Sequence, residues 1–364
     1  MKLANHLRGV AVAISIMGCG SASVATSEPD AGIDGSSVDA SDIPLGCGDP
    51  TCLYLPPRLP IELVELAVTD LARVGGPREI PIAIRFAPTA PRPMPVVVWS
   101  HGGAGGQLDP TRALDQWAIA AAEAGYLSVA IAHVPRDQAS REALCASLGF
   151  DAAGCATFKF LGYDRPIDIA LTIDKLAELA TQPQFAGRFD LAKLAVGGHS
   201  AGAGGTLMVD GASRDINGVA TLISDPRPIA FLAFSPQAAG SDGMTEAGYA
   251  QITRPTLIGT GRGDENPPDT ADGRAAVYDL MQPGNKARIF VEDAAAIHTV
   301  FALELDNCTN GATLARCEQM RDWVKSAGLA FLDAHLRSAP AAIAFLASTD
   351  LAVASGGVAE WSTR

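Results

Sequence analysis

Uninterrupted apolar runs recur along this chain, and most of them end in small or polar residues. Both faces of a buried parallel strand are apolar, so such runs are typical of buried strands. Stretches with a helical spacing of apolar residues lie between and after the runs. This alternation predicts an α/β fold, with a mainly parallel sheet that helices cover on both faces. The expected strands are 94–99, 126–132, 190–196, 228–234, 255–259 and 287–291, and the expected helices are 114–124, 167–180 and 323–336.

A different pattern precedes the first of these strands. Residues 65–71 and 79–86 alternate between apolar and polar, and Gly75, Gly76 and Pro77 lie between them. Alternation around a glycine-containing turn predicts an antiparallel N-terminal hairpin at an edge of the sheet. Pro81 suits an edge strand, because proline has no N–H, and every N–H of an inner strand faces a neighbouring strand.

The apolar periodicity is lost over residues 133–161. We expect a loop there, or a small lid over a site. Arg165 and Pro166 follow, and proline is tolerated in the first turn of a helix because an N–H in that turn has no helical partner. The pattern therefore predicts that the helix 167–180 begins at these two residues.

The first 18 residues have the pattern of a secretory signal. Lys2 and Arg8 precede an apolar run, 10–17, that is too short to span a membrane. Residues 16–19, Ile-Met-Gly-Cys, resemble a bacterial lipobox, in which Cys19 receives lipid after cleavage; ordinary cleavage near Ala25 is the alternative. We therefore expect an exported protein, favouring a cell-envelope lipoprotein over a periplasmic or freely secreted protein.

Composition separates a tether from a folded domain. Within residues 19–53, the stretch 20–44 is polar and acidic and contains no Lys or Arg. It cannot bury enough apolar surface to order itself, which predicts a flexible tether. Residues 54–364 are expected to form one folded domain, because 48% of the 364 residues are hydrophobic and can build a large core.

The charge of the chain restricts its partners. The formal net charge is −13 at pH 7, and removal of Lys2 and Arg8 with the signal would make it about −15. A strongly acidic protein is repelled by phosphate groups, so we expect no nucleic-acid partner and no membrane contact apart from the lipid anchor. The pattern predicts no particular oligomeric state.

The cysteines that remain after Cys19 are even in number and fall into close sequential pairs. Three disulfides that close short loops are the simplest arrangement in an exported chain. A metal site is the alternative, but no pair has histidines at ligand spacing, and we predict no metal. The expected pairs are Cys47 with Cys52, Cys145 with Cys155, and Cys308 with Cys317.

One stretch carries the candidate chemistry. An apolar run ends in Gly-His-Ser-Ala-Gly, residues 198–202, and small residues follow. A Gly-x-Ser-x-Gly motif alone is weak, since it would occur by chance roughly 0.2 times in a chain this rich in glycine. A strand before it and a helix after it are the context of a nucleophile elbow, in which Ser200 would stand on a sharp, strained turn above the sheet.

A serine nucleophile needs a base, and the base needs an acid that orients it. In an elbow protein both follow the serine in the chain. His298 lies in a loop after the last expected strand, at the carboxyl end of the sheet, whereas His335 falls within a helix. Asp264 follows strand 255–259 and is the expected acid, with Glu265 and Asp293 as alternatives.

The tetrahedral intermediate also needs hydrogen-bond donors for its oxyanion. We expect the backbone N–H groups of Ala201, directly after the nucleophile, and of Gly103, in the glycine-rich loop after strand 94–99. The ring of His101 in that loop is expected to bond loop backbone. His199 is expected to support the turn around Ser200.

Several motifs occur in an order that resembles one group of enzymes. They are Trp99-Ser100-His101-Gly102-Gly103, Arg165-Pro166-Ile167-Asp168, Gly198-His199-Ser200-Ala201-Gly202, Ser235-Pro236-Gln237, Thr260-Gly261-Arg262-Gly263-Asp264 and His298. Over roughly residues 63–337 the set resembles α/β-hydrolase superfamily serine hydrolases: predicted dienelactone hydrolases, platelet-activating-factor acetylhydrolases and cutinase-like polyester hydrolases. The resemblance implies an α/β-hydrolase fold and hydrolysis of carboxylic esters, with Ser200, Asp264 and His298 as a triad and Gly103 and Ala201 as oxyanion donors.

Departures from the family narrow the expected activity. Dienelactone hydrolases proper use a cysteine where this chain has Ser200, and cutinase-like enzymes usually have aromatic residues at the positions of Gly103 and Gln237. We therefore expect a serine esterase that needs no cofactor and acts on a small-molecule or polymeric ester. A polyester hydrolase, a lipase or an amidase is the enzymatic alternative, and a non-catalytic surface binding protein with the same fold is the alternative of another class.

Four polar or aromatic residues are candidates for lining the substrate pocket. For each of them, ordinary packing or surface exposure is the alternative. They are Gln107, Trp117, Tyr163 and Gln237.

Overall fold

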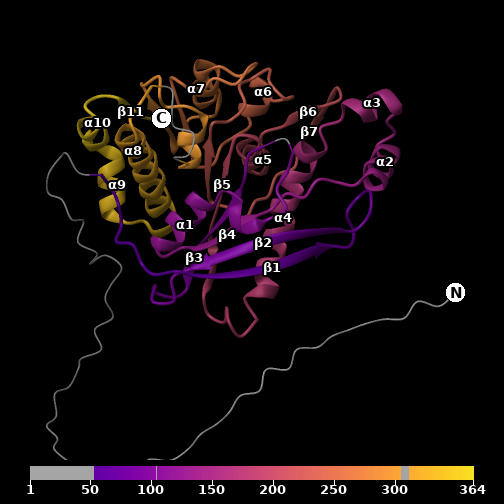
Figure 1. Ribbon diagram of the computed structural model, residues 1–364, viewed down its shortest axis with the longest axis horizontal. Helices are drawn as coiled ribbons and strands as arrows, with labels where there is room; N and C mark the ends of the chain where they lie inside the picture. Colours follow the sequence, from indigo (N-terminus) through magenta and orange to yellow (C-terminus); the bar gives the residue numbers. More distant parts are fainter. Residues whose placement is uncertain (1–52, 104, 305–310) are drawn as a thin grey trace, which may run out of the picture. The chain divides into compact units, whose positions relative to one another are not determined.

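A large sheet forms the centre of the fold in the computed structural model, which describes residues 53–103, 105–304 and 311–364 (Figure 1). Within these residues nine strands pair in the order β1-β2-β4-β3-β5-β8-β9-β10-β11. Six neighbouring strands of this order, from β4 to β10, run parallel, and most of their residues are buried, which explains the uninterrupted apolar runs. They are β4 (Leu127–Ile131), β3 (Met94–Ser100), β5 (Phe189–His199), β8 (Ala230–Phe234), β9 (Thr256–Gly261) and β10 (Lys286–Val291).

The predicted N-terminal hairpin is confirmed. β1 (Glu62–Asp70) and β2 (Arg78–Phe86) pair antiparallel. The expectation that Pro81 marks an edge strand is wrong, because β2 lies between β1 and β4 and β1 is the edge. The strand tolerates Pro81 at the end of the β2–β4 ladder, where its carbonyl still accepts a 2.9 Å bond from the N–H of Ala132.

Helices cover both faces of the sheet. Val97 of β3 packs in one apolar cluster with α1 (Asp115–Glu123) and α8 (Leu314–Leu332). Its neighbours Val96 and Val98 pack in another cluster with α4 (Phe160–Leu179). Successive side chains of a strand point to opposite faces, so these helices lie on opposite sides of the sheet.

The segment without periodicity, 133–161, contains two helices. α2 (Gln138–Ser147) and α3 (Ala152–Thr157) are joined by the predicted disulfide between Cys145 and Cys155. Cys317 is also disulfide-bonded. The other predicted partners and the lipidation site lie outside the described residues, as do the signal segment and nearly all of the tether; these cysteines are Cys19, Cys47, Cys52 and Cys308.

Two helices begin earlier than their sequence pattern predicts. α4 begins at Phe160, so Pro166 lies inside it rather than at its start. Asp164 lies in the turn before the proline, and its buried carboxylate pairs with Arg73 and Arg136, which fixes this turn against the rest of the fold. α8 begins at Leu314, where the Thr313 hydroxyl accepts a 3.2 Å bond from the N–H of Arg316.

The C-terminal part adds elements that the pattern did not predict. β11 (Ala359–Thr363) pairs antiparallel with β10 and forms the second edge of the sheet. Its residues are only partly buried, so they lack the apolar run that identified the parallel strands.

The remaining elements are α5 (Ala201–Asp210), α6 (Glu246–Tyr249), α7 (Ala271–Leu280), α9 (Pro340–Ala347), α10 (Asp350–Ala354), the hairpin β6 (Arg214–Ile216) and β7 (Val219–Thr221), the short 3-10 helices Pro110–Arg112 and His298–Ala302, and a π-helical turn over Asp333–Arg337.

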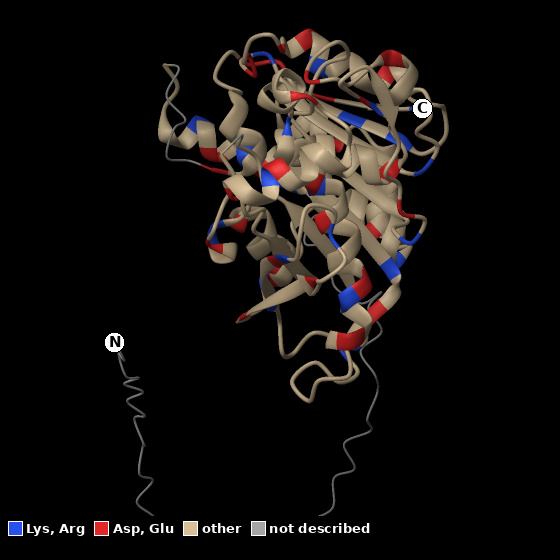
Figure 2. Cartoon of the chain, turned by 90° about the vertical axis from the view of Figure 1, so that its right-hand side faces the viewer, with Lys and Arg blue, Asp and Glu red and all other residues tan. Residues whose placement is uncertain are grey.

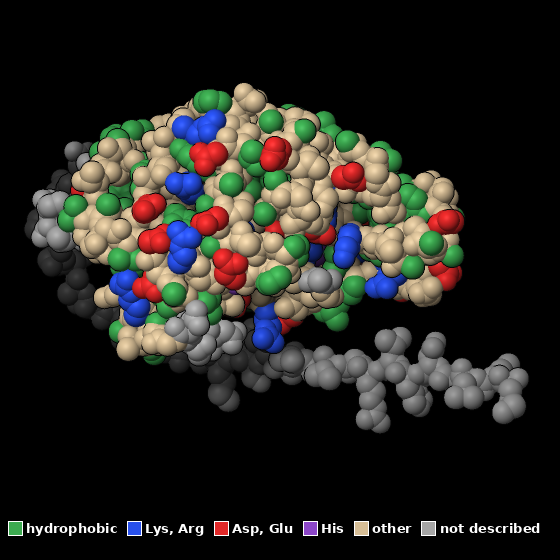
Figure 3. Space-filling model, turned by 90° about the horizontal axis from the view of Figure 1, so that it is seen from above, with side chains coloured by type: hydrophobic (Ala, Val, Ile, Leu, Met, Phe, Trp, Pro, Cys, Tyr) green, Lys and Arg blue, Asp and Glu red, His purple; other side chains and the backbone are tan. Residues whose placement is uncertain are grey.

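The surface carries both signs of charge. Acidic and basic residues lie interspersed along the ribbon in Figure 2. On the face drawn in Figure 3, apolar side chains are scattered among polar ones. None of the helices in the described residues is both long enough and apolar enough to span a bilayer.

Candidate active site

Ser200 stands on a sharp turn between strand β5 and helix α5. Its backbone angles are φ 55° and ψ −123°, a conformation that a residue with a side chain rarely adopts. A 2.9 Å bond from its N–H to the carbonyl of Phe234 holds it there. A Cβ at Gly202 would lie 2.0 Å from the carbonyl oxygen of Ser100, so small residues are required around the turn. The strand, turn and helix expected from the sequence are all present.

The side chains of Asp264 and His298 meet above the carboxyl end of the sheet. Asp264 follows β9, and its Oδ1 lies 2.7 Å from Nδ1 of His298, at the start of the 3-10 helix after β10. The other oxygen of Asp264 accepts a 2.8 Å bond from the Thr260 hydroxyl. Asp264 is completely buried, whereas the His298 side chain is 25% exposed, so this imidazole is accessible and its carboxylate partner is not.

Neither alternative acid contacts His298. Glu265 accepts a 3.1 Å bond from the N–H of Ala271, and Asp293 pairs with Arg316 at 2.8 Å. Both carboxylates therefore stabilise local structure. Of the three candidates from the sequence, the structure brings Asp264 to the histidine.

Asp264 is ionised in this environment. Burial raises the pKa of its carboxyl, but the hydrogen bond and charge of His298 and the nearby guanidinium of Arg274 outweigh burial and lower the pKa overall. A carboxylate can only accept hydrogen bonds, so Nδ1 of His298 donates to it. In a neutral ring, Nε2 is then left with a free lone pair.

His199 links the serine turn to the His298 loop. Its Nε2 lies 2.9 Å from the carbonyl oxygen of His298, and the two ring centroids are 4.5 Å apart. A carbonyl accepts only, so Nε2 of His199 carries the proton. Burial lowers the pKa of His199 to about 3, and the ring is neutral. Since Ser200 is the next residue, this bond holds the serine turn beside His298. The sequence led us to expect that His199 supports the turn, but not that its partner is the backbone of His298.

The glycine-rich loop after β3 lies against the serine. A Cβ at Gly102 would lie 3.0 Å from Cβ of Ser200, and Gly103 adopts φ 85°, which favours glycine. The buried guanidinium of Arg165 donates to the carbonyl oxygens of Gly102 and Gly103, at 3.3 Å and 2.7 Å. Ala201 is the first residue of α5, so its N–H has no partner within the helix.

The ring of His101 bonds to backbone, as expected. Its Nε2 accepts a 3.1 Å bond from the N–H of His133, so Nδ1 carries the proton and donates to the carbonyl of Gly102 at 2.6 Å. Burial lowers the pKa of His101 to about 3, and the ring is neutral.

Trp117 is a core residue, and its assignment to the pocket is corrected. Its ring is completely buried and stacks against Trp99 and Phe234, with centroids 5.5 Å and 4.4 Å away. Its indole N–H donates to the carbonyl of Phe301 at 2.9 Å. A ring enclosed on both faces, with its polar atom bonded, has no surface left for a substrate.

Two other pocket candidates make local contacts. The amide oxygen of Gln107 accepts bonds of 3.0 Å and 3.2 Å from the N–H groups of Leu108 and Asp109. The amide oxygen of Gln237 packs so closely on α5 that a Cβ at Gly204 would lie 2.5 Å from it.

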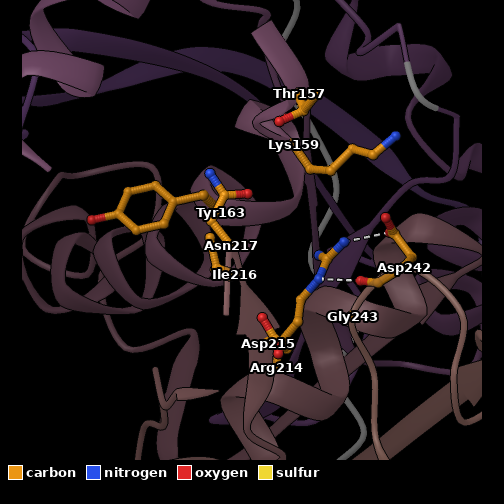
Figure 4. A pocket seen from close by; sticks show the side chains of 9 residues that line it. All are labelled: Thr157, Lys159, Tyr163, Arg214, Asp215, Ile216, Asn217, Asp242 and Gly243. Carbon is orange, nitrogen blue, oxygen red and sulfur yellow. Dashed lines mark hydrogen bonds and ion pairs between the residues drawn. The ribbon is translucent and has the colours of Figure 1, made fainter. Parts of the chain in front are cut away.

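Tyr163 does line a pocket, of about 210 Å³ (Figure 4). Arg214 crosses this pocket and donates through Nε to the backbone carbonyl of Asp242 at 2.6 Å, and its guanidinium pairs with the carboxylate of the same residue. Neither Ser200 nor His298 is among the residues that line it, which are Thr157, Lys159, Tyr163, Arg214, Asp215, Ile216, Asn217, Asp242 and Gly243.

Within the described ranges, no group of three or more His, Cys, Asp or Glu side chains is arranged to hold a metal ion. A scan of family models and a search of curated proteins find no match to this chain.

Proposed function

We propose that this protein is an exported serine hydrolase that cleaves carboxylic esters, with Ser200, His298 and Asp264 as its catalytic triad on an α/β-hydrolase fold. The observation that carries the proposal is the 2.7 Å bond between Asp264 and the accessible ring of His298, whose loop is bonded to the residue before Ser200. A buried acid, an imidazole that it orients and a serine on a strained turn are the three parts that acyl transfer needs.

The position of the site in the sheet supports the same fold. Ser200 follows β5, Asp264 follows β9 and His298 follows β10, all parallel strands of one sheet. Ligands of open α/β sheets bind outside the carboxyl ends of the strands. The chain order of serine, acid and histidine is also the order in α/β-hydrolases.

Each group has a defined role in the proposed reaction. Nε2 of His298 takes the proton from the Ser200 hydroxyl as its oxygen attacks the ester carbonyl. The N–H groups of Ala201 and Gly103 donate to the oxyanion of the tetrahedral intermediate. The alcohol leaves with the proton from His298, and an acyl group remains on Ser200. Water then attacks this acyl-enzyme by the same route, which releases the acid and restores the serine.

Asp264 acts through the tautomer of His298. As a carboxylate it fixes the Nδ1 proton and stabilises the imidazolium that forms when Nε2 accepts the serine proton. Thr260 and Arg274 hold the carboxylate in turn, at 2.8 Å and 3.3 Å. The orientation of the base is therefore set by buried groups that a substrate does not disturb.

The test is turnover of p-nitrophenyl acetate and p-nitrophenyl butyrate by wild type and Ser200→Ala. We expect the variant to lose about 10⁴-fold or more in kcat/KM and to unfold at the same temperature as wild type. Ser348→Ala is the matched control, since its hydroxyl bonds to the carbonyl of Phe345, far along the chain from the site.

A fluorophosphonate probe separates an enzyme from a binding protein with the same fold. Wild type should be labelled at Ser200, and Ser200→Ala should not be labelled. A wild-type protein that neither labels nor hydrolyses any ester of a panel graded by acyl length would refute the proposal. The panel would also identify the preferred acyl group, which pocket shape decides.

A further inference from the structure

A second serine, histidine and aspartate form a hydrogen-bonded series beneath the glycine-rich loop. The hydroxyl of Ser100, the last residue of β3, lies 2.8 Å from Nε2 of His133. Nδ1 of His133 lies 2.9 Å from a carboxylate oxygen of Asp168 on α4. Each of these three residues is 0% exposed. No substrate can reach them, so the arrangement is not a second catalytic site.

The protonation state of the series follows from its partners. Arg73 and Arg78 pair with the carboxylate of Asp168 at 2.8 Å and 2.9 Å. Burial raises the pKa of Asp168, but the hydrogen bond from His133 and the bond and charge of Arg78 outweigh burial and lower the pKa overall. Burial lowers the pKa of His133 to about 4, so its ring is neutral. Nδ1 therefore donates to Asp168, and Nε2 accepts from the Ser100 hydroxyl.

The backbone of His133 bonds to both described parts of the glycine-rich loop, residues 101–103 and 105–107. Its N–H donates to Nε2 of His101 at 3.1 Å, and its carbonyl accepts a 3.1 Å bond from the N–H of Gln107. A Cβ at Gly106 would lie 2.6 Å from the same carbonyl. A shift of His133 would therefore displace the loop at His101 and at Gln107 together.

We propose that Ser100, His133 and Asp168 are positioning residues that fix residues 101–103 relative to Ser200 and so aim the N–H of Gly103 at the oxyanion. The inference rests on the proposed hydrolase function. The series joins β3, the residues after β4, and α4 through buried side chains whose hydrogen bonds water cannot replace. It fixes His133, and His133 fixes the loop. Arg165, three residues before Asp168 on α4, holds the carbonyls of the loop from the same helix.

The test uses three variants of the full chain. Ser100→Ala removes one hydroxyl and is mild, His133→Gln shortens the series, and Tyr126→Phe is the matched control. The Tyr126 hydroxyl bonds to Asp333 and is also completely buried, but it is not part of the series or of the loop. Thermal melting first establishes that each variant is folded.

The expected result is a loss in kcat with little change in KM. For Ser100→Ala and His133→Gln we expect kcat to fall about 10- to 100-fold, because a displaced donor weakens binding of the transition state more than of the substrate. KM should stay within about twofold, and the pH profile of kcat should keep the midpoint of wild type, since His298 and Asp264 are untouched. Tyr126→Phe should keep wild-type kcat.

Amide hydrogen exchange tests the positioning role independently of activity. The amides of residues 102, 103, 105 and 106 should exchange faster in Ser100→Ala and His133→Gln than in Tyr126→Phe. Unchanged exchange and unchanged kcat in the two folded series variants, or equal changes in the control, would overturn the inference. If wild type hydrolyses no ester but the two series variants still exchange faster than the control, the positioning role is supported and the proposed function is refuted. The two failures are therefore distinguishable.

Discussion

Nε2 of His199 donates a hydrogen bond to the carbonyl oxygen of His298, 2.9 Å away and 99 positions further along the chain. This bond joins the turn that carries the candidate nucleophile to the loop that carries the candidate base. It uses the backbone of His298 and leaves the imidazole of that residue free to act. The relative position of Ser200 and His298 therefore depends on a neighbour of the candidate triad.

His199→Phe should lower kcat/KM about tenfold, because loss of the bond frees the His298 loop by a fraction of an ångström and misaligns serine and base. Ester turnover at saturating substrate, which gives kcat, and at low substrate, which gives kcat/KM, measures the effect. His335→Phe is the control, since His335 is also partly buried and its ring packs on Phe331 at 4.4 Å. Wild-type turnover in His199→Phe would show that the bond is not needed for alignment.

Asp264→Asn should lower kcat about 10³- to 10⁴-fold, because an amide can hold His298 in the wrong tautomer. Asp293→Asn and Glu265→Gln should retain nearly full activity, since both acids have structural partners of their own. Steady-state kinetics of the three variants decide among the acids. Loss in either control equal to that of Asp264→Asn would contradict the assignment.

Stability should fall as the pH drops below about 6.5. Burial lowers the pKa of His101, His133 and His199 to between about 3 and about 4, whereas an unfolded histidine titrates near 6.5. Between these values the unfolded chain binds protons that the folded chain excludes, so acid favours unfolding. Each ring contributes about 1.4 kcal/mol of free energy of unfolding per pH unit.

Urea unfolding at pH 6.5, 6.0, 5.5 and 5.0 measures this slope. In His133→Gln, the number of protons taken up on unfolding, which sets this slope, should be smaller by about one, whatever the variant does to stability at neutral pH. The same slope in wild type and variant would mean that His133 is protonated in the folded protein or shielded equally in the unfolded one.

The disulfide between Cys145 and Cys155 should stabilise the α2–α3 region. Its partners are 10 residues apart, and closing so short a loop in the unfolded chain is worth about 3 kcal/mol at most. We expect the double variant Cys145→Ser, Cys155→Ser to melt at a lower temperature and to be cleaved by protease first within 137–158. Ser147→Ala, on the same helix, is the control. Unchanged melting and protease resistance would mean that packing alone holds the two helices.

Local patterns determined the candidate triad. The elbow was identifiable because Gly198 and Gly202 are the small neighbours that the turn at Ser200 needs. Asp264 and His298 were identifiable because each directly follows an apolar run, and the ends of parallel strands meet at one edge of a sheet. Such information lies within a few residues of chain, as does the pairing of Cys145 with Cys155.

Long-range packing decided the groups that hold these residues in place. The bonds from His199 to His298, from Arg165 to Gly103 and from Ser100 through His133 to Asp168 join residues 33 to 99 positions apart, and no sequence spacing indicates them. Trp117 also could not be placed from the sequence alone. Its helix is visible in the apolar spacing, but the rings that enclose its side chain belong to two strands, β3 and β8. Apolar spacing determines which elements form, and the burial and pairing of polar groups is decided only when those elements pack.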